Sequence, residues 1–422
     1  MKKIVLSLAL IGLMFTGGQA AAVLCSIDDV PAASLLLPYF EVDFNDDQGV
    51  TTLFEINNAS ASPAIAHVTL WTTWSVPTLD FDVYLTGYDI VAINVRDIFN
   101  GILPTTDHTN TVASPIGAFS WPFAGEANPV ANFASCDPYL PYGTLAPILV
   151  SHIRAAHTGL ASPITNACAS FVTENAIGYI TVDNVSVCST AFPTENGYFV
   201  DGGLGIANNL NMLWGNYYIV DPANNFAEAD TLVALEATQQ DMAGMWAAGD
   251  YTFYHGKVNE GIGDQFLDNR EPLGTTWAAR YITGGAFSGG TKITAWRSTE
   301  QYDQFLTCGT VPVWYPLGQA QIVIFDEEEN PELPPGCTVS PCLDIPGITP
   351  FPEETQKVQV GGPNFPTPFN FGWTYLNLNF NPIGTVSPDG FKQSYVAVSM
   401  SAEGRYTVGY AAFLLNHACN PD

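Results

Sequence analysis

The sequence predicts a mainly β protein, built as two tandem β-sandwich units (immunoglobulin-like or jelly-roll-like) with long disulfide-stapled loops and few helices. Three observations predict this fold class. Short runs alternate apolar and polar residues, 37 Gly and 30 Pro interrupt the chain, and helical periodicity is scarce. Half-buried strands alternate with period two, and Gly and Pro end them in turns. Many short strands separated by such turns are typical of sandwiches.

The alternating pattern begins at residues 51–57 and returns at 67–71 after a turn rich in small residues. Further predicted strands share its short length and its bounding Gly, Pro, Asn or Asp residues: 81–86, 91–96, 179–187, 212–220, 231–237, 321–325, 375–380, 395–401 and 405–415. Glu403 and Gly404 are placed to form a tight hairpin between the last two. The best helix candidate is 145–156, and 236–247 is a second one.

A faint internal repeat divides the chain. Thr51 and Thr275 each lie at the start of a strand, a small-residue turn follows, and the next strand ends in Trp71 or Trp296. Two related units would explain this spacing. The alternative is that generic hairpins resemble one another.

From this repeat we expect an N-terminal β-sandwich domain over 23–190, a linker over 191–205 and a C-terminal β-sandwich domain over 206–422. Residues 1–22 read as a signal peptide, because a positive region precedes a short apolar run and small residues that suit a signal peptidase. That run is too short to cross a bilayer, and no longer one follows, so no transmembrane segment is expected. The predicted location is exported: periplasm, outer surface or extracellular medium.

The charge balance narrows the classes of partner. The chain carries 41 acidic and 12 basic side chains, for a formal net charge of −29. Nucleic acid and anionic lipid surfaces would be repelled, so neither is an expected partner. Hydrophobic residues make up 47% of the chain, which excludes intrinsic disorder.

The cysteine count fits an oxidising compartment. An even number of cysteines in an exported chain indicates disulfides, and a zinc site is disfavoured because no Cys-x₂-Cys pair occurs. We expect Cys337 and Cys342 either to form a local bridge or to anchor their loop to Cys308 and another partner. All eight cysteines are expected to be bridged: Cys25, Cys136, Cys168, Cys188, Cys308, Cys337, Cys342 and Cys419.

Four runs, at 36–43, 81–89, 178–183 and 268–273, resemble those of an uncharacterised group of secreted bacterial β-rich proteins. The resemblance covers nearly the whole chain. It implies a bacterial, exported protein and supplies no catalytic residues.

One segment has the oxygen spacing of a cation site. Asp43, Asn45 and Asp47 place side-chain oxygens at alternate positions, as Ca²⁺ requires. A helix–loop–helix calcium site also needs Gly and Glu where Gln48 and Phe54 stand. Because predicted strands flank the segment, a polar hairpin turn is the favoured interpretation. No cofactor is therefore expected, with calcium as the alternative.

Aromatic residues form two groups that β-sandwich modules could use to stack on sugars. The ligand-binding candidates are Trp71, Trp74, Tyr84, Tyr88, Trp214 and Tyr217. The favoured interpretation is that they fill the core between sheets. Trp71 and Trp74 have opposite parity, so on a regular strand they face opposite ways and at least one could be exposed.

No catalytic residue is predicted. His-Glu-x-x-His and Gly-x-Ser-x-Gly sequences are absent, and His152 and His157 are too far apart around the predicted helix to share a metal. These two histidines are expected at the surface or an interface.

Three hypotheses for function follow. The leading one is an exported, non-catalytic structural, surface or adhesive β protein, with glycans or other surface proteins as partners. The alternatives are a carbohydrate-binding module protein and a secreted hydrolase acting on a polymer. The sequence does not predict an oligomeric state.

Overall fold

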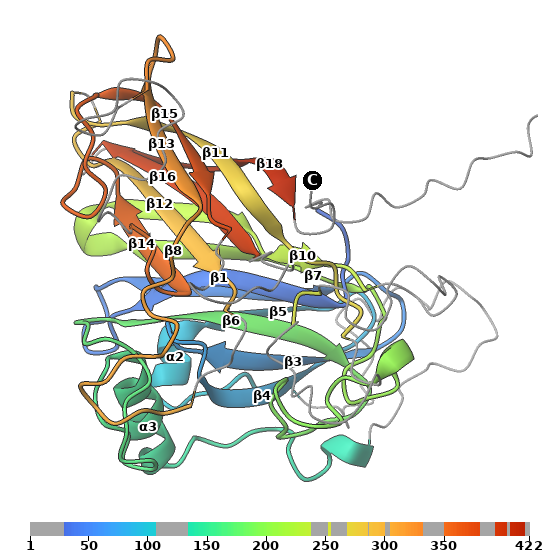
Figure 1. Ribbon diagram of the computed structural model, residues 1–422. Coiled ribbons are helices and arrows are strands. Elements are labelled where there is room, and N and C mark those ends of the chain that lie inside the picture. The colour runs from blue at the N-terminus through green and yellow to red at the C-terminus, as the bar shows by residue number, and fades with distance from the viewer. Residues whose placement is uncertain are drawn as a thin grey trace, which may run out of the picture.

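The protein is mainly β, as the sequence predicts (Figure 1). In the computed structural model, the described residues are 29–106, 134–237, 252–254, 268–285, 287–299, 304–331, 350–379, 393–402 and 406–417. In these ranges the chain forms three antiparallel sheets and two short α-helices. Neither helix has the length and hydropathy to span a bilayer.

The central sheet has the strand order β10-β1-β6-β3-β4. Its strands are β1 (Ser34–Val42), β3 (Ala64–Trp71), β4 (Pro77–Leu85), β6 (Ala176–Val185) and β10 (Val233–Leu235). A bulge interrupts the pairing of β1 with β6 between Leu37 and Phe40. Pro38 lies inside this bulge, where a residue without an N–H group can be accommodated.

The small sheet has the order β5-β2-β8-β9, with β7 paired to β2. Its strands are β2 (Thr51–Asn58), β5 (Ile90–Asn94), β7 (Leu213–Trp214), β8 (Asn216–Asp221) and β9 (Phe226–Thr231).

The large sheet has the order β13-β15-β11-β16-β12-β14, with β17 paired to β16 and β18 paired to β11. Its strands are β11 (Gly274–Ile282), β12 (Gly290–Arg297), β13 (Gln321–Asp326), β14 (Thr355–Gln359), β15 (Phe371–Asn377), β16 (Ser394–Ala402), β17 (Tyr406–Ala411) and β18 (Phe413–His417). The antiparallel pairing of β16 with β17 agrees with the predicted hairpin.

The central sheet is buried on both faces. Leu35 and Leu37 pack into a core shared with the small sheet, whereas Leu36 packs into a core shared with the large sheet. Figure 1 shows the large sheet above the central strands, with α2 and α3 at the lower left. Period-two patterning missed β1 because its residues are nearly all apolar. β3 and β6 of the same sheet were predicted, because they carry buried polar residues such as Thr69 and Thr181 at alternate positions.

Strands that follow residue 205 complete the sheets of the first half. β10 pairs with β1, while β7 and β8 pair with β2. The central and small sheets therefore extend in sequence to Leu235.

The helices lie at one end of the central sheet. α2 (Val95–Phe99) begins at Asn94, whose side chain caps the Arg96 N–H. α3 (Pro147–His157) confirms the predicted helix at 145–156, and proline occupies its first turn. Most of the second predicted helix, 236–247, lies outside the described residues.

His152 and His157 are buried, not at the surface as predicted. α3 packs against β4 and β6, and the His152 ring contacts the Phe305 ring and the Ser162 hydroxyl. His157 Nδ1 lies 2.9 Å from the Ile177 carbonyl oxygen, and Nε2 lies 2.8 Å from the Thr78 hydroxyl. Burial lowers the pKa of His157 to about 4, so its ring is neutral at pH 7.

Two disulfides join the described cysteines, Cys136 with Cys188 and Cys168 with Cys308. The second bond corrects the expectation that Cys308 could pair with Cys337 or Cys342. It ties the loop after α3 to the segment that precedes β13. The other predicted disulfide partners, Cys25, Cys337, Cys342 and Cys419, lie outside the described residues.

Loss of the Cys168–Cys308 bond should destabilise the protein more than loss of the Cys136–Cys188 bond. The first closes a sequence separation of 140 residues and the second one of 52. The chain-entropy difference is about 1 kcal/mol, within a total of about 2–4 kcal/mol for each bond. Denaturant unfolding of the two double Cys→Ser variants measures this difference. An equal or reversed order would contradict the prediction.

Candidate functional site

The predicted aromatic site is mostly core. Trp71, Trp74, Tyr84 and Tyr217 are each less than 5% exposed, so these rings are not accessible to a sugar. Trp74 packs edge-on against Phe171. Neither Trp71 nor Trp74 is exposed, although the strand pattern suggested that one could be. β3 ends at Trp71, so the alternation of a strand does not extend to Trp74, which lies in the turn that follows.

Trp71 and Trp296, the matching tryptophans of the internal repeat, both contact the ring of Tyr179. Tyr179 stacks on Trp71 at 5.7 Å between ring centroids and contacts Trp296 edge-on at 5.9 Å. The Trp71 indole also donates to the Thr181 hydroxyl at 2.8 Å. These tryptophans join the central and large sheets.

Tyr88 and Trp214 are the exposed members of the aromatic group, at 55% and 41%. Tyr88 follows β4 in a turn and has a positive φ, whereas Trp214 lies on β7. Within the described part of the chain, neither ring contacts another aromatic ring. The structure therefore does not assemble the predicted residues into one stacking platform.

An arginine occupies the centre of the predicted cation loop. The Arg96 guanidinium donates to the carbonyl oxygens of Asp43, Asp47, Gly49 and Val50 at 2.6–3.1 Å. The Asp43 carboxylate accepts backbone N–H bonds from Asn45 and Asp46, as in a polar turn. Among the described residues, no group of three or more His, Cys, Asp or Glu side chains could hold a metal.

A fully buried carboxylate, Asp183 on β6, gathers donors from distant segments. The hydroxyl groups of Tyr198 and Tyr254 each donate to it at 2.9 Å, and Ser34 on β1 donates as well. Arg270 donates to the same Ser34 hydroxyl at 2.9 Å and lies over the Phe199 ring. Burial raises the pKa of both tyrosines, and the negative charge on Asp183 raises it further, so both remain protonated donors.

A second buried carboxylate, Glu354, lies where the central and large sheets meet. It accepts from the Thr299 backbone N–H at 2.6 Å and from the Tyr179 hydroxyl at 3.3 Å. Ser75, in the turn between β3 and β4, also donates to it. Ser75 has a nucleophile's hydroxyl beside an acid, but the group is enclosed in protein, so its contacts are those of a structural junction.

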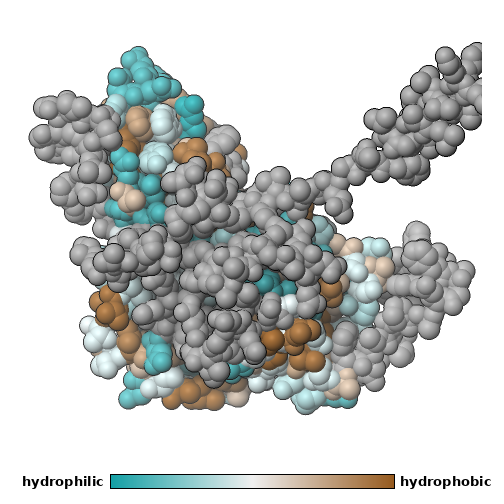
Figure 2. All heavy atoms as spheres, turned by 45° about the vertical axis from the view of Figure 1, so that its right-hand side comes forward, coloured by the Kyte–Doolittle hydropathy of each residue, from teal (hydrophilic) through white to brown (hydrophobic). Residues whose placement is uncertain are grey.

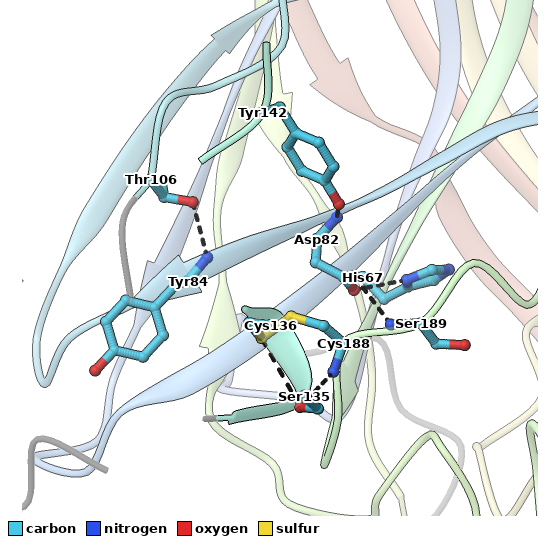
Figure 3. Close-up of a disulfide and its surroundings, with 9 residues drawn as sticks. All are labelled: His67, Asp82, Tyr84, Thr106, Ser135, Cys136, Tyr142, Cys188 and Ser189. Carbon is cyan, nitrogen blue, oxygen red and sulfur yellow. Dashed lines mark hydrogen bonds and ion pairs between the residues drawn. A yellow bond between two sulfur atoms is a disulfide. The ribbon is translucent and has the colours of Figure 1, made fainter. Parts of the chain in front are cut away.

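His67 and Asp82 form a buried pair beside the Cys136–Cys188 bond (Figure 3). The distance from His67 Nδ1 to the Asp82 carboxylate is 2.9 Å, as in a catalytic triad. A triad needs a hydroxyl nucleophile at Nε2, whereas here the Asp80 carboxylate lies there at 3.6 Å. Burial alone would lower the pKa of His67, but the hydrogen bond to Asp82 and the charges of nearby aspartates raise it overall.

An open cleft of about 400 Å³ lies between the small and large sheets. The turn from β8 to β9 forms one wall, and β12, β14, β16 and β17 form the other. Polar side chains predominate in its lining: Glu41, Asp221, Asn224, Asn225, Ser288, Lys292, Lys357, Gln359, Ser401 and Thr407, with Val50, Ile219, Phe226, Gly289 and Ala402.

Two lysines converge on one aromatic ring in this cleft. The ammonium groups of Lys292 and Lys357 lie 5.6 and 5.7 Å from the centroid of Phe226. Lys357 forms an ion pair with Glu228 on β9. Within the described ranges, the Lys292 ammonium has no hydrogen-bond or ion-pair partner.

Sequence reasoning did not identify the cleft. Lys292, Lys357 and Phe226 lie on three strands and share no local motif. The one signal in the sequence was the scarcity of lysine, which makes any lysine unusual. Their convergence depends on the pairing of β12 with β14 and on the contact between β9 and β17.

Replacing Arg96 by Ala should lower the free energy of unfolding by about 2–4 kcal/mol, because four carbonyl oxygens lose a charged donor. Arg96→Lys should recover part of this loss, since an ammonium cannot make the forked contact. Urea unfolding measures both variants, and Arg280→Ala, at an exposed arginine, is the control. A calcium site at this loop would be shown if millimolar Ca²⁺ raised the wild-type Tm.

Glu353 should make the protein less stable as the pH rises. Burial raises its pKa from the ordinary value of 4.5 to about 7. A carboxyl with a raised folded-state pKa destabilises the folded state as the pH rises through that interval. Glu353→Gln should gain about 1–2 kcal/mol at pH 8, after discounting for partial exposure, and nothing at pH 4. Thermal unfolding at both pH values tests this, and an equal gain at both would contradict it.

No protein-family model, curated protein or solved structure matches this chain.

Proposed function

We propose that this is an exported, non-catalytic β protein that acts as a structural, surface or adhesive component. The observation that carries the proposal is the Glu354 junction. Its carboxylate accepts hydrogen bonds from Ser75 and Tyr179 of the first half and from Thr299 of the second. A rigid connection between layers suits a load-bearing or exposed protein better than an enzyme that must open and close.

Further cross-links act across the same layers. Thr355 on β14 donates to the Pro38 carbonyl oxygen in the bulge of β1, at 2.5 Å. Within the second half, the Arg297 guanidinium donates to several loop carbonyl oxygens, including that of Phe351 at 2.6 Å. The Cys168–Cys308 bond adds a covalent connection. Many such contacts must break together before a layer separates, which favours slow unfolding and resistance to proteases.

The groups capable of acid–base or nucleophilic chemistry support a non-catalytic role. Asp183 and Glu354 are enclosed and accept several hydrogen bonds, and His67 lies between two aspartates. In this proposal the two sandwich units share the central sheet, one with the small sheet and one with the large sheet.

The surface offers contact points for a partner. Figure 2 shows hydrophobic residues on the lower half of the visible face. Exposed apolar side chains include Val172, Leu204 and Val313. Contacts of this kind would serve adhesion to other surface proteins.

Protease resistance and cell fractionation test the proposal together. We expect the mature chain, without residues 1–22, in an exported fraction with its cysteines bridged. Glu354→Gln should shorten the half-life of the folded chain in proteinase K by about tenfold or more. One of the groups that donate to the carboxylate would then face an amide NH₂ group, which cannot accept its hydrogen bond. Asp326→Asn, at an exposed carboxylate that also accepts backbone N–H bonds, is the matched control.

Recovery of the intact chain in the cytoplasm with free thiols would contradict the exported role. Release of products from a panel of polysaccharides and proteins by the purified chain would contradict the non-catalytic role.

A further inference from the structure

We propose that the cleft between the small and large sheets binds a neutral saccharide, with Lys292 as its principal hydrogen-bond donor. This site differs from the aromatic surface that the sequence suggested. It adds a ligand to the structural role proposed above and does not depend on it.

The size and shape of the cleft suit a small polar ligand. Its volume of about 400 Å³ falls within the range of ~300–1,000 Å³ that is usual for small-molecule sites. Two different sheets supply its walls, so side chains reach the cavity from opposite sides. A concave site of this kind holds one end of a glycan and not a long stretch of a flat polymer.

Several polar groups in the cleft have free hydrogen-bonding capacity. The Lys292 ammonium has no polar partner among the described residues, and the side chains of Asn225, Ser288 and Ser401 likewise make no hydrogen bond there. Asp221 accepts from Asn224, yet its carboxylate has further lone pairs free. A ligand with several hydroxyl groups could accept hydrogen bonds from the free donors and donate to the free acceptors.

Charges of both signs face the cavity, which favours a neutral ligand. Lys357 is neutralised by Glu228, leaving Lys292 together with the carboxylates of Glu41 and Asp221. An anionic ligand would meet two carboxylates, and a cationic ligand would meet Lys292. A sugar hydroxyl both donates and accepts, so it can bond to either group.

Phe226 supplies the apolar contact that sugar sites need. Its ring lines the cleft and is partly exposed. The ammonium groups of Lys292 and Lys357 lie over this ring, so a sugar in the cleft could meet polar donors and the remaining apolar ring surface together.

A glycan array followed by calorimetry tests this inference on the oxidised mature chain. The array should carry neutral hexose, pentose and N-acetylhexosamine ends, with uronic acid and sialic acid ends for comparison. We expect binding to a subset of the neutral ends. Calorimetry then uses the best-bound array glycan as the probe.

Lys292→Met should weaken that binding by about tenfold or more, because a charged hydrogen-bond donor is lost. Lys292→Arg should retain most of it, and Phe226→Leu should weaken it without changing the Tm by more than a few degrees. Trp214→Ala, at an exposed tryptophan outside the cleft lining, is the control and should bind like the wild type.

Three outcomes would overturn the inference: no binding to any neutral end, binding confined to acidic ends, or binding lost in Trp214→Ala but kept in folded Lys292→Met. Failure here would leave the structural role intact, because protease resistance and fractionation measure that role independently.

Discussion

The absence of a water-facing side on the central sheet is the constraint on which the rest of the structure depends. A polar side chain in such a sheet has no solvent to bond with, so protein groups must satisfy it. Asp183 meets this requirement through Ser34, Tyr198 and Tyr254, which come from three separate parts of the sequence. The long-range topology and the buried hydrogen bonds are therefore two consequences of one arrangement.

The same constraint explains why acidic groups serve as connectors in a strongly acidic chain. A buried carboxylate accepts several donors at once, and Glu354 uses this capacity to hold turns of both halves together. Two buried arginines make the opposite kind of connection, in which one group donates to several acceptors. Arg96 and Arg297 each donate to a ring of backbone carbonyl oxygens and thereby close loops that contain no regular structure.

Local patterns predicted the elements whose sequence alternates between apolar and polar residues or has a helical period, such as β2 and α3. They failed for β1, since its residues are nearly all apolar and do not alternate. The partners of a strand were also beyond local patterns, because the pairing of β10 with β1 joins residues far apart in sequence. The cleft belongs to this second class: Lys292 and Phe226 carry no shared motif, and their proximity follows from how the sheets stack. Trp71 and Trp74, by contrast, were placed in the core by the favoured interpretation, whereas Trp214 is exposed.

The long-range pairing of the central sheet has a consequence for folding. A chain delivered from its N-terminus presents β1 long before β10 and the large sheet exist to cover it. Until residue 308 emerges, the apolar strands of the first half remain without one of their layers. High contact order of this kind slows folding and prolongs the exposure of unpaired, aggregation-prone strand edges. The core of the first half is therefore complete only when strands from both halves of the sequence are present.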